Sequence, residues 1–251
     1  MTDLITLVNK EVSRFMRIWK QTLLPPVITI VLYLLIFWKF IWEKIQIIEW
    51  VSYIDFIFPG LLMMSVITSS YWNTSSSFFG WKFQKSIEEL YVSPISHTKI
   101  LFWFCIGWIL RWVLVGLLVY ITWLLMVDIH IFSFFYTFLF IILTSMLFSL
   151  AGILNAIYAK SFDDINIIPS FFITPMIYLW WVFYSISLLS PTWQIISKVN
   201  PILYMVNGLR YWFLGISDVN IYVSISIISV FIIIFSVFSL YLLKKGYWIK
   251  S

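Results

Sequence analysis

Few side chains in this sequence are of the types that catalyse reactions or bind metal ions, and their arrangement suits neither task. The single cysteine, Cys105, lies inside an apolar run, which excludes an internal disulfide and a multi-cysteine metal site. The two histidines, His97 and His130, fall at opposite ends of the architecture derived below, too far apart to share a metal ion. No G-x-x-x-x-G-K, H-E-x-x-H or G-x-S-x-G sequence occurs. We therefore expect no enzymatic activity, no cofactor and no nucleotide site in this chain itself.

One charged residue, Arg111, lies within a long hydrophobic run. If that run crosses a membrane, placing an arginine there costs about 2.5–3.5 kcal/mol on insertion scales, so the side chain faces protein or water rather than lipid. It could bind an anionic group of a substrate on a translocation pathway. It could equally cap backbone carbonyls in the helix packing, or extend toward the membrane surface. The sequence leaves both interpretations open.

The amino-acid composition indicates the environment in which the chain folds. Of its 251 residues 62% are hydrophobic and only 11% are charged, with a mean hydropathy of +0.98. A soluble domain is about 45–50% apolar and about 25% charged. The charges, which sum to +5, stand between hydrophobic runs and therefore indicate membrane topology rather than binding to nucleic acid. We expect an all-α, polytopic membrane protein embedded in a lipid bilayer.

The hydrophobic runs predict a single domain, 1–251, built as a bundle of six transmembrane helices. The predicted spans are 22–41, 56–79, 101–127, 132–159, 167–189 and 221–243. Each has close to the ~20 apolar residues that cross a ~30 Å hydrocarbon layer. Most Lys and Arg residues fall on the side that also carries both chain ends, and the positive-inside rule makes that side cytoplasmic. Both termini are therefore predicted to be cytoplasmic.

Two segments outside the spans are predicted to lie in or near the membrane. Residues 3–20 have an apolar stripe at helical spacing and a basic opposite face, typical of an amphipathic helix in the membrane interface. Residues 191–220 are too apolar for a plain loop, and we expect short outer helices that are re-entrant or interfacial. Expected interruptions of this second segment are Pro201, Gly208, Arg210 and Gly215.

The cytoplasmic loop 82–99 contains a predicted short helix. Its residues are Ser86, Ile87, Glu88, Glu89, Leu90 and Tyr91. Ser86 and Glu89 have the spacing of a capping box, and Pro94 ends the helix. This helix either docks a partner protein through its apolar face or merely covers the ends of its own spans.

Several short strings along the chain carry a family resemblance. They include R-F-M-R-I-W at 14–19, P-P-V-I-T at 25–29, P-G-L at 59–61, M-M-S-V-I-T at 63–68, I-E-E-L at 87–90, L-F-S-L-A-G at 147–152, F-D-D at 162–164 and N-P at 200–201. In number and order they resemble the membrane subunits of ABC-2 type transporters, over nearly the whole chain. The resemblance implies a permease of the bacterial inner membrane that works in export.

The resemblance also implies partners and sites. Two copies of this chain, as a homodimer, would pair with two copies of a separate ATP-binding subunit. Residues 87–91 would be the coupling helix with Glu88 and Glu89 at the docking face, and Asp163 and Asp164 would lie close to the same partner. Trp180 and Trp181 stand where a small residue is expected, near the outer end of the fifth span, and would alter packing or pathway there. The alternatives are an ATP-independent carrier or channel and a non-transporting membrane scaffold, and nothing selects a cargo.

Overall fold

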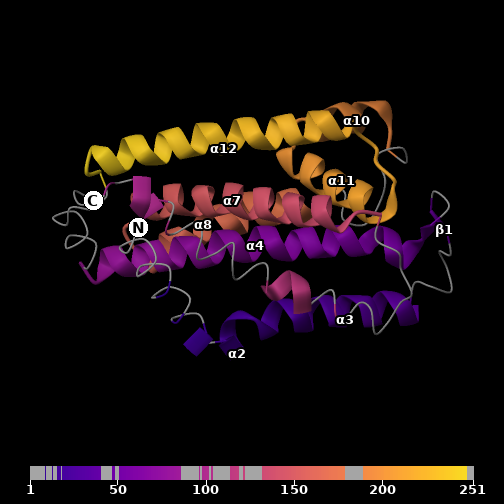
Figure 1. Ribbon diagram of the computed structural model, residues 1–251, viewed down its shortest axis with the longest axis horizontal. Coiled ribbons are helices and arrows are strands. Elements are labelled where there is room, and N and C mark those ends of the chain that lie inside the picture. The colour runs from indigo at the N-terminus through magenta and orange to yellow at the C-terminus, as the bar shows by residue number, and fades with distance from the viewer. Residues whose placement is uncertain are drawn as a thin grey trace.

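The computed structural model describes residues 9, 13, 16–17, 19–40, 47–48, 51–85, 96, 98–101, 103, 114–118, 121, 132–178 and 189–247. Within them, long helices run side by side along the longest dimension of the molecule (Figure 1). The elements in chain order are α2 Trp19–Thr22, α3 Leu24–Phe40, β1 Ile47–Ile48, β2 Val51–Ser52, α4 Tyr53–Phe83, α7 Phe134–Tyr158, α8 Phe162–Ile168, η1 Pro169–Ile173, α9 Thr174–Tyr178, α10 Pro191–Lys198, α11 Pro201–Leu214 and α12 Ile221–Lys244. The strands β1 and β2 form a minimal antiparallel ribbon, and the other elements are helical.

Helices α4 and α7 pack tightly at the centre through small and hydroxyl-bearing residues. The Ser70 hydroxyl donates to the hydroxyl oxygen of Ser145 at 3.2 Å across the interface. A Cβ atom added at Gly152 would lie 2.7 Å from the backbone oxygen of Tyr71, so only glycine permits this approach. Small residues that bring backbones together, with hydroxyl groups that bond across the interface, are typical of helix association in membranes.

Helix α12 has the surface of a helix that faces hydrocarbon. Val230, Ile233, Ile234 and Val237 are all more than half exposed. In the described part of the chain, two helices, α7 and α12, are long and apolar enough to cross a membrane, and 24–36 within α3 forms a shorter apolar helix. Helices therefore occupy the ranges of several predicted spans. The third span, 101–127, lies mostly outside the described residues, so the total of six stays a prediction.

Helix α4 differs from the predicted second span. It begins at Tyr53 and ends at Phe83, with Pro59 inside it rather than at its start. Its 31 residues give about 46 Å of rise, enough to pass through the headgroup regions as well as the hydrocarbon layer. A series of serine and threonine residues between 68 and 77 lowers its hydropathy, and several of these hydroxyls donate to carbonyls one turn earlier in the same helix.

The segment 191–220 forms two helices, of which α11 is longer than predicted. Pro201 begins α11, where the side chain of Asn200 accepts from the N–H of Ile202, and Gly215 ends it in the left-handed conformation with φ 79°. The predicted interruptions at Gly208 and Arg210 are wrong, because both lie inside α11. A Cβ atom at Gly208 would overlap the ring of Phe140 on α7. This glycine therefore serves helix packing rather than ending a helix.

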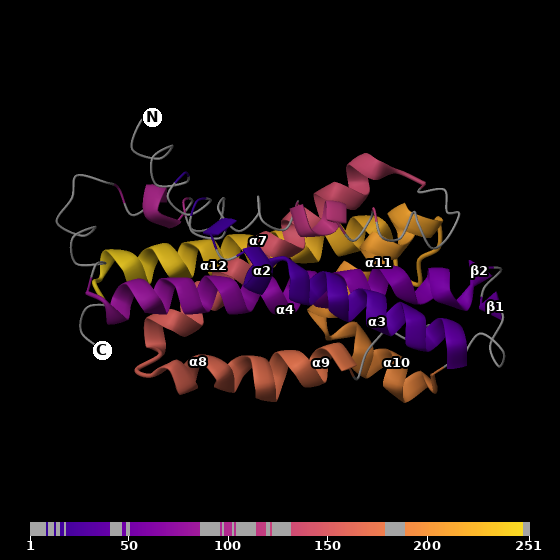
Figure 2. The same cartoon turned by 90° about the horizontal axis from the view of Figure 1, so that it is seen from below.

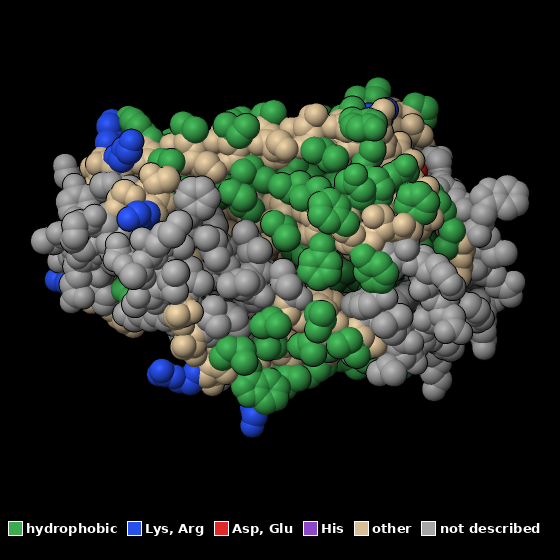
Figure 3. Space-filling view, in the orientation of Figure 1, with side chains coloured by type: hydrophobic (Ala, Val, Ile, Leu, Met, Phe, Trp, Pro, Cys, Tyr) green, Lys and Arg blue, Asp and Glu red, His purple; other side chains and the backbone are tan. Residues whose placement is uncertain are grey.

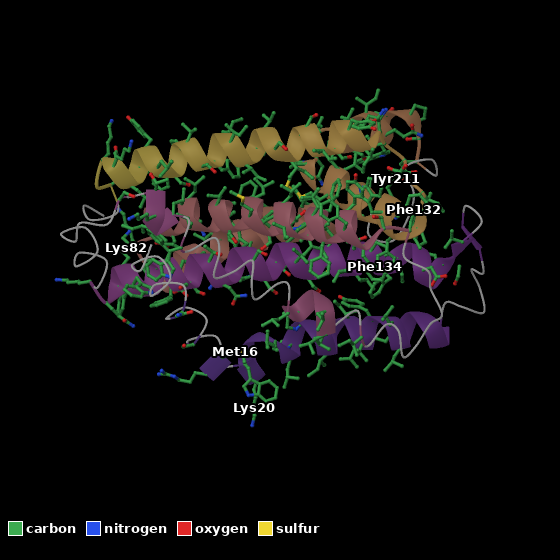
Figure 4. The ribbon with its side chains drawn as sticks, in the orientation of Figure 1. Met16, Lys20, Lys82, Phe132, Phe134 and Tyr211 are labelled. Atoms are coloured by element: carbon green, nitrogen blue, oxygen red, sulfur yellow. The ribbon has the colours of Figure 1, made fainter. Side chains whose placement is uncertain are left out.

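Helices α8, η1 and α9 form one bent rod along a side of the bundle, seen below α4 in Figure 2. The N–H of Thr174 donates to the oxygen of Pro169, the i→i+5 bond of a π-helix. The amide of Asn200 donates to the oxygen of Met176 at 3.2 Å and so joins this rod to the turn between α10 and α11. Of the predicted interfacial helix 3–20, isolated residues are described, and Figure 4 shows Met16 and Lys20 beside α2, on the outside of the bundle.

Candidate functional site

The ends of α4, α7 and α12 meet at one end of the molecule, where α8 begins (Figures 1 and 2). Five lysines mark it, and Figure 3 shows Lys and Arg side chains gathered on that end of the visible face. They are Lys82, Lys85, Lys160, Lys244 and Lys245. We call this region the basic end.

The turn into α8 is fixed by a capping box that the sequence analysis did not identify. The Ser161 hydroxyl accepts from the N–H of Asp164 at 3.2 Å. The Asp164 carboxylate in turn accepts from the N–H groups of Lys160 at 2.8 Å and of Ser161 at 3.0 Å. These bonds stabilise the ionised form and hold the pKa of Asp164 below its ordinary value. The spacing S-x-x-D at 161–164 was the available signal.

Lys82 joins the end of α4 to the end of α7. Its Nζ donates to the backbone oxygens of Ile157 at 3.0 Å and of Ala159 at 2.9 Å. These carbonyls belong to the last turn of α7 and to its C-cap, where helical partners are missing and the helix dipole is negative. These bonds tie the end of α4 directly to the end of α7.

An aromatic cluster covers the same junction. Phe162 at the start of α8 packs edge-on against Phe79 of α4, with ring centroids 4.8 Å apart, and lies 5.5 Å from Phe83. Phe83 is 68% exposed and Phe162 is 51% exposed. Asp163 is exposed beside them and takes no part in the capping box. Exposed rings next to a solvated carboxylate make a surface suited to contact with another protein.

The two predicted aspartates thus have different tasks. Asp164 fixes the backbone at the start of α8, whereas Asp163 points its charge outward. Phe83 and Phe162 were not predicted, because isolated phenylalanines in a chain with 21% aromatic residues give no sequence signal. Lys82 was assigned only to the topology. The remaining predicted site residues lie outside the described residues: Ser86, Ile87, Glu88, Glu89, Leu90, Tyr91, Arg111, Trp180 and Trp181.

At the opposite end, α11 carries a buried cation. Arg210 has no exposed surface, and its guanidinium lies 3.8 Å from the ring centroid of Phe56 on α4. Its Nη1 is 3.6 Å from Oδ2 of Asp218, whose side chain is 10% exposed. The N–H of Asp218 donates to the Asn207 side chain at 3.1 Å. The sequence predicted Arg210 only as an interruption of the outer segment 191–220, whereas it lies inside α11 and pairs with Asp218.

Aromatic side chains surround the same region, as Figure 4 shows for Phe132 and Tyr211. Tyr136 stacks on Trp212 with ring centroids 3.9 Å apart. The N–H groups of Phe132 and Ser133 donate to the oxygens of Phe213 and Trp212. The entry to α7 thereby caps the end of α11.

The sequence of this helical bundle, with its exposed apolar surface and two charged ends, is similar to those of known proteins. A family model described as ABC-2 type transporter matches residues 2–214. The chain belongs to the ABC-2 type transporter family. It is 48% identical over 242 residues, 96% of this chain and 94% of the relative, to the "Inner membrane transport permease YadH" of Escherichia coli K12. The same identity and coverage hold for the protein of that name from Shigella flexneri.

Membership of the ABC-2 family makes this chain a helical membrane protein and a transport component. The exposed apolar face of α12 therefore suits lipid or another membrane-embedded chain rather than water.

Proposed function

We propose that this chain is the membrane-spanning subunit of an ATP-driven exporter, with six spans and both termini in the cytoplasm of a bacterial inner membrane. A separate ATP-binding subunit supplies the energy, in an assembly of two copies of each chain. The ATP-binding subunit docks at the basic end. The relatives named as inner membrane transport permeases support the placement in an inner membrane and the role in transport.

The observation that carries the proposal is the junction of α4, α7 and α8. The predicted coupling residues 87–91 begin four positions after Phe83, the last residue of α4, which contacts Phe162. Asp163 adjoins the same contact. Movement of a docked partner would act on α4 and α8 together, and Lys82 would pass it to α7 through its bonds to Ile157 and Ala159. ATP hydrolysis by the docked subunit outside the membrane would thus shift the packed helices within it.

Reversal of charge at the docking surface tests the proposal. In cells that produce the cognate ATP-binding subunit, Asp163→Lys and the double variant Glu88→Lys/Glu89→Lys should reduce its co-purification and abolish ATP-dependent transport. Lys198→Glu, an exposed charge change on α10 at the other end, is the matched control and should retain both. Wild-type recovery of the ATP-binding subunit with the Asp163 and Glu88/Glu89 variants would refute the docking site. Transport by the purified chain without any ATP-binding subunit would refute the exporter mechanism and favour a carrier.

A further inference from the structure

A cavity of about 360 Å³ opens on the side of the bundle that α7 and α12 share with the α8–α9 rod. Its wall is almost entirely apolar. Leu147, Phe148 and Ala151 come from α7, Phe231 and Phe235 from α12, and Met176 from α9. Met176 is more than a third exposed, so the cavity communicates with the surroundings of the protein. We call it the lateral groove.

One end of the lateral groove is polar. Tyr71 of α4 and Asn155 of α7 line it there. The Tyr71 hydroxyl is buried, and the Asn155 amide lies within hydrogen-bonding reach of its oxygen. The described residues offer its O–H proton no acceptor of acceptable geometry. The Asn155 amide already donates to the oxygen of Ile165 at 3.0 Å. A buried O–H group that lacks an acceptor is costly unless a ligand or water supplies one.

The polar end lies near the membrane surface. Asn155 precedes the α7 C-cap Ala159 by one helical turn, about 6 Å of rise, and the exposed Lys160 follows. Leu147 lies about 12 Å deeper along the same helix. The groove therefore changes from polar to apolar in the direction in which a phospholipid changes from ester to acyl chain. Water does not suit the rest of the groove, because a bound water molecule needs two to four polar partners.

We propose that the lateral groove binds one acyl chain of a phospholipid from the leaflet at the basic end. The chain lies along Leu147, Phe231 and Phe235, and its ester carbonyl accepts a hydrogen bond from the Tyr71 hydroxyl. Lys160 lies at the level of the headgroup, where its charge attracts the phosphate. The bound lipid holds the α8–α9 rod against α7 and α12. This assignment rests on the membrane placement in the proposed function but not on coupling to ATP.

Photolabelling of the full chain in lipid nanodiscs tests the groove. The probes are two forms of phosphatidylglycerol, each with a diazirine in the middle of one hydrocarbon chain. In the first probe an ester joins this chain to glycerol, and in the second probe an ether does. The ester probe should label Phe231 or Phe235 more strongly than the exposed face at Val230 and Ile233. It should also label about threefold to tenfold more than the ether probe, because an ether oxygen is the weaker acceptor.

Three variants separate the parts of the proposal. Tyr71→Phe preserves the shape of the groove and should remove the preference for the ester probe. Ala151→Trp fills the groove and should abolish labelling at Phe231 and Phe235, whereas Val230→Trp on the lipid-facing surface should not. Equal labelling of groove and surface in the wild type would mean surrounding lipid only and would overturn the site. An ester preference that survives in Tyr71→Phe would overturn the assignment of the hydroxyl. Neither readout requires the ATP-binding subunit, so failure here leaves the exporter proposal standing.

Discussion

Neutralising Asp218 should destabilise the protein more than neutralising both members of its ion pair. Arg210 is completely buried, and its Nη1 lies 3.6 Å from Asp218 Oδ2. Asp218→Asn keeps the buried cation in place and removes the carboxylate that lies 3.6 Å from it. Arg210→Met removes the cation and leaves Asp218, which is 10% exposed and can be reached by solvent.

The expected loss of unfolding free energy follows from this difference in burial between Arg210 and Asp218. Removal of one partner of a buried pair costs about 3–5 kcal/mol, because the other charge stays buried without compensation. We expect that range for Asp218→Asn. For Arg210→Met the lost terms are the ion pair and the contact with Phe56 at 3.8 Å, a cation–π interaction worth up to about 2 kcal/mol when desolvated. The methionine recovers part of this by packing. The double variant should resemble Arg210→Met, so the coupling free energy should equal the cost of Asp218→Asn alone, about 3–5 kcal/mol.

Equilibrium unfolding of the purified chain in mixed micelles, followed by near-UV circular dichroism, measures the four members of this double-mutant cycle. Lys198→Gln, a neutralised but exposed charge on α10, is the control and should change the free energy of unfolding by less than about 0.5 kcal/mol. Additive effects of Asp218→Asn and Arg210→Met would refute the reasoning, since they would mean that the two side chains do not stabilise each other.

Two further substitutions are informative. Gly208→Ala should lower the free energy of unfolding by about 1–3 kcal/mol, because the new methyl group overlaps Phe140. Gly80→Ala is the control, since its position has open space, and it should be neutral or stabilising. Equal effects of the two substitutions would contradict the packing argument. The cap formed by Asp164 depends on a lowered pKa, so its contribution is complete above the unfolded value of about 3.9 and is lost as pH falls through the folded value. Backbone amide exchange at 160 and 161, corrected for intrinsic rates, should therefore accelerate only in acid; Asp164→Asn should show faster exchange already at neutral pH, and Asp163→Asn should behave as the wild type.

Helical structure and membrane placement could be predicted from the sequence because both depend on summed apolar content. Gly215 was correctly taken as an interruption. This prediction succeeds because a left-handed φ is a local property that glycine adopts without strain.

Tertiary relations explain the failures. Gly208 and Arg210 were interpreted as interruptions of a helix, yet both serve contacts with other helices: Phe140 for the glycine, and Phe56 with Asp218 for the arginine. No local pattern shows that a charge will meet its counter-charge across a turn. The exposed patch formed by Phe83 and Phe162 was missed for the same reason, since the two phenylalanines come together only when α8 folds back on α4.

The π-helical turn η1 has a consequence for chain length. Each residue of an α-helix rotates the following side chains by about 100°, and a π turn holds one residue more than an α turn. Deleting a single residue from 169–173 would therefore restore regular α-helix and leave α9 close to its present rotation. Deleting one residue from α8 would instead rotate everything beyond it by about 100°. Met176 would then leave the wall of the lateral groove, and its carbonyl would turn away from Asn200. The π turn is thus the one place in the rod where the chain can lose a residue and keep these contacts.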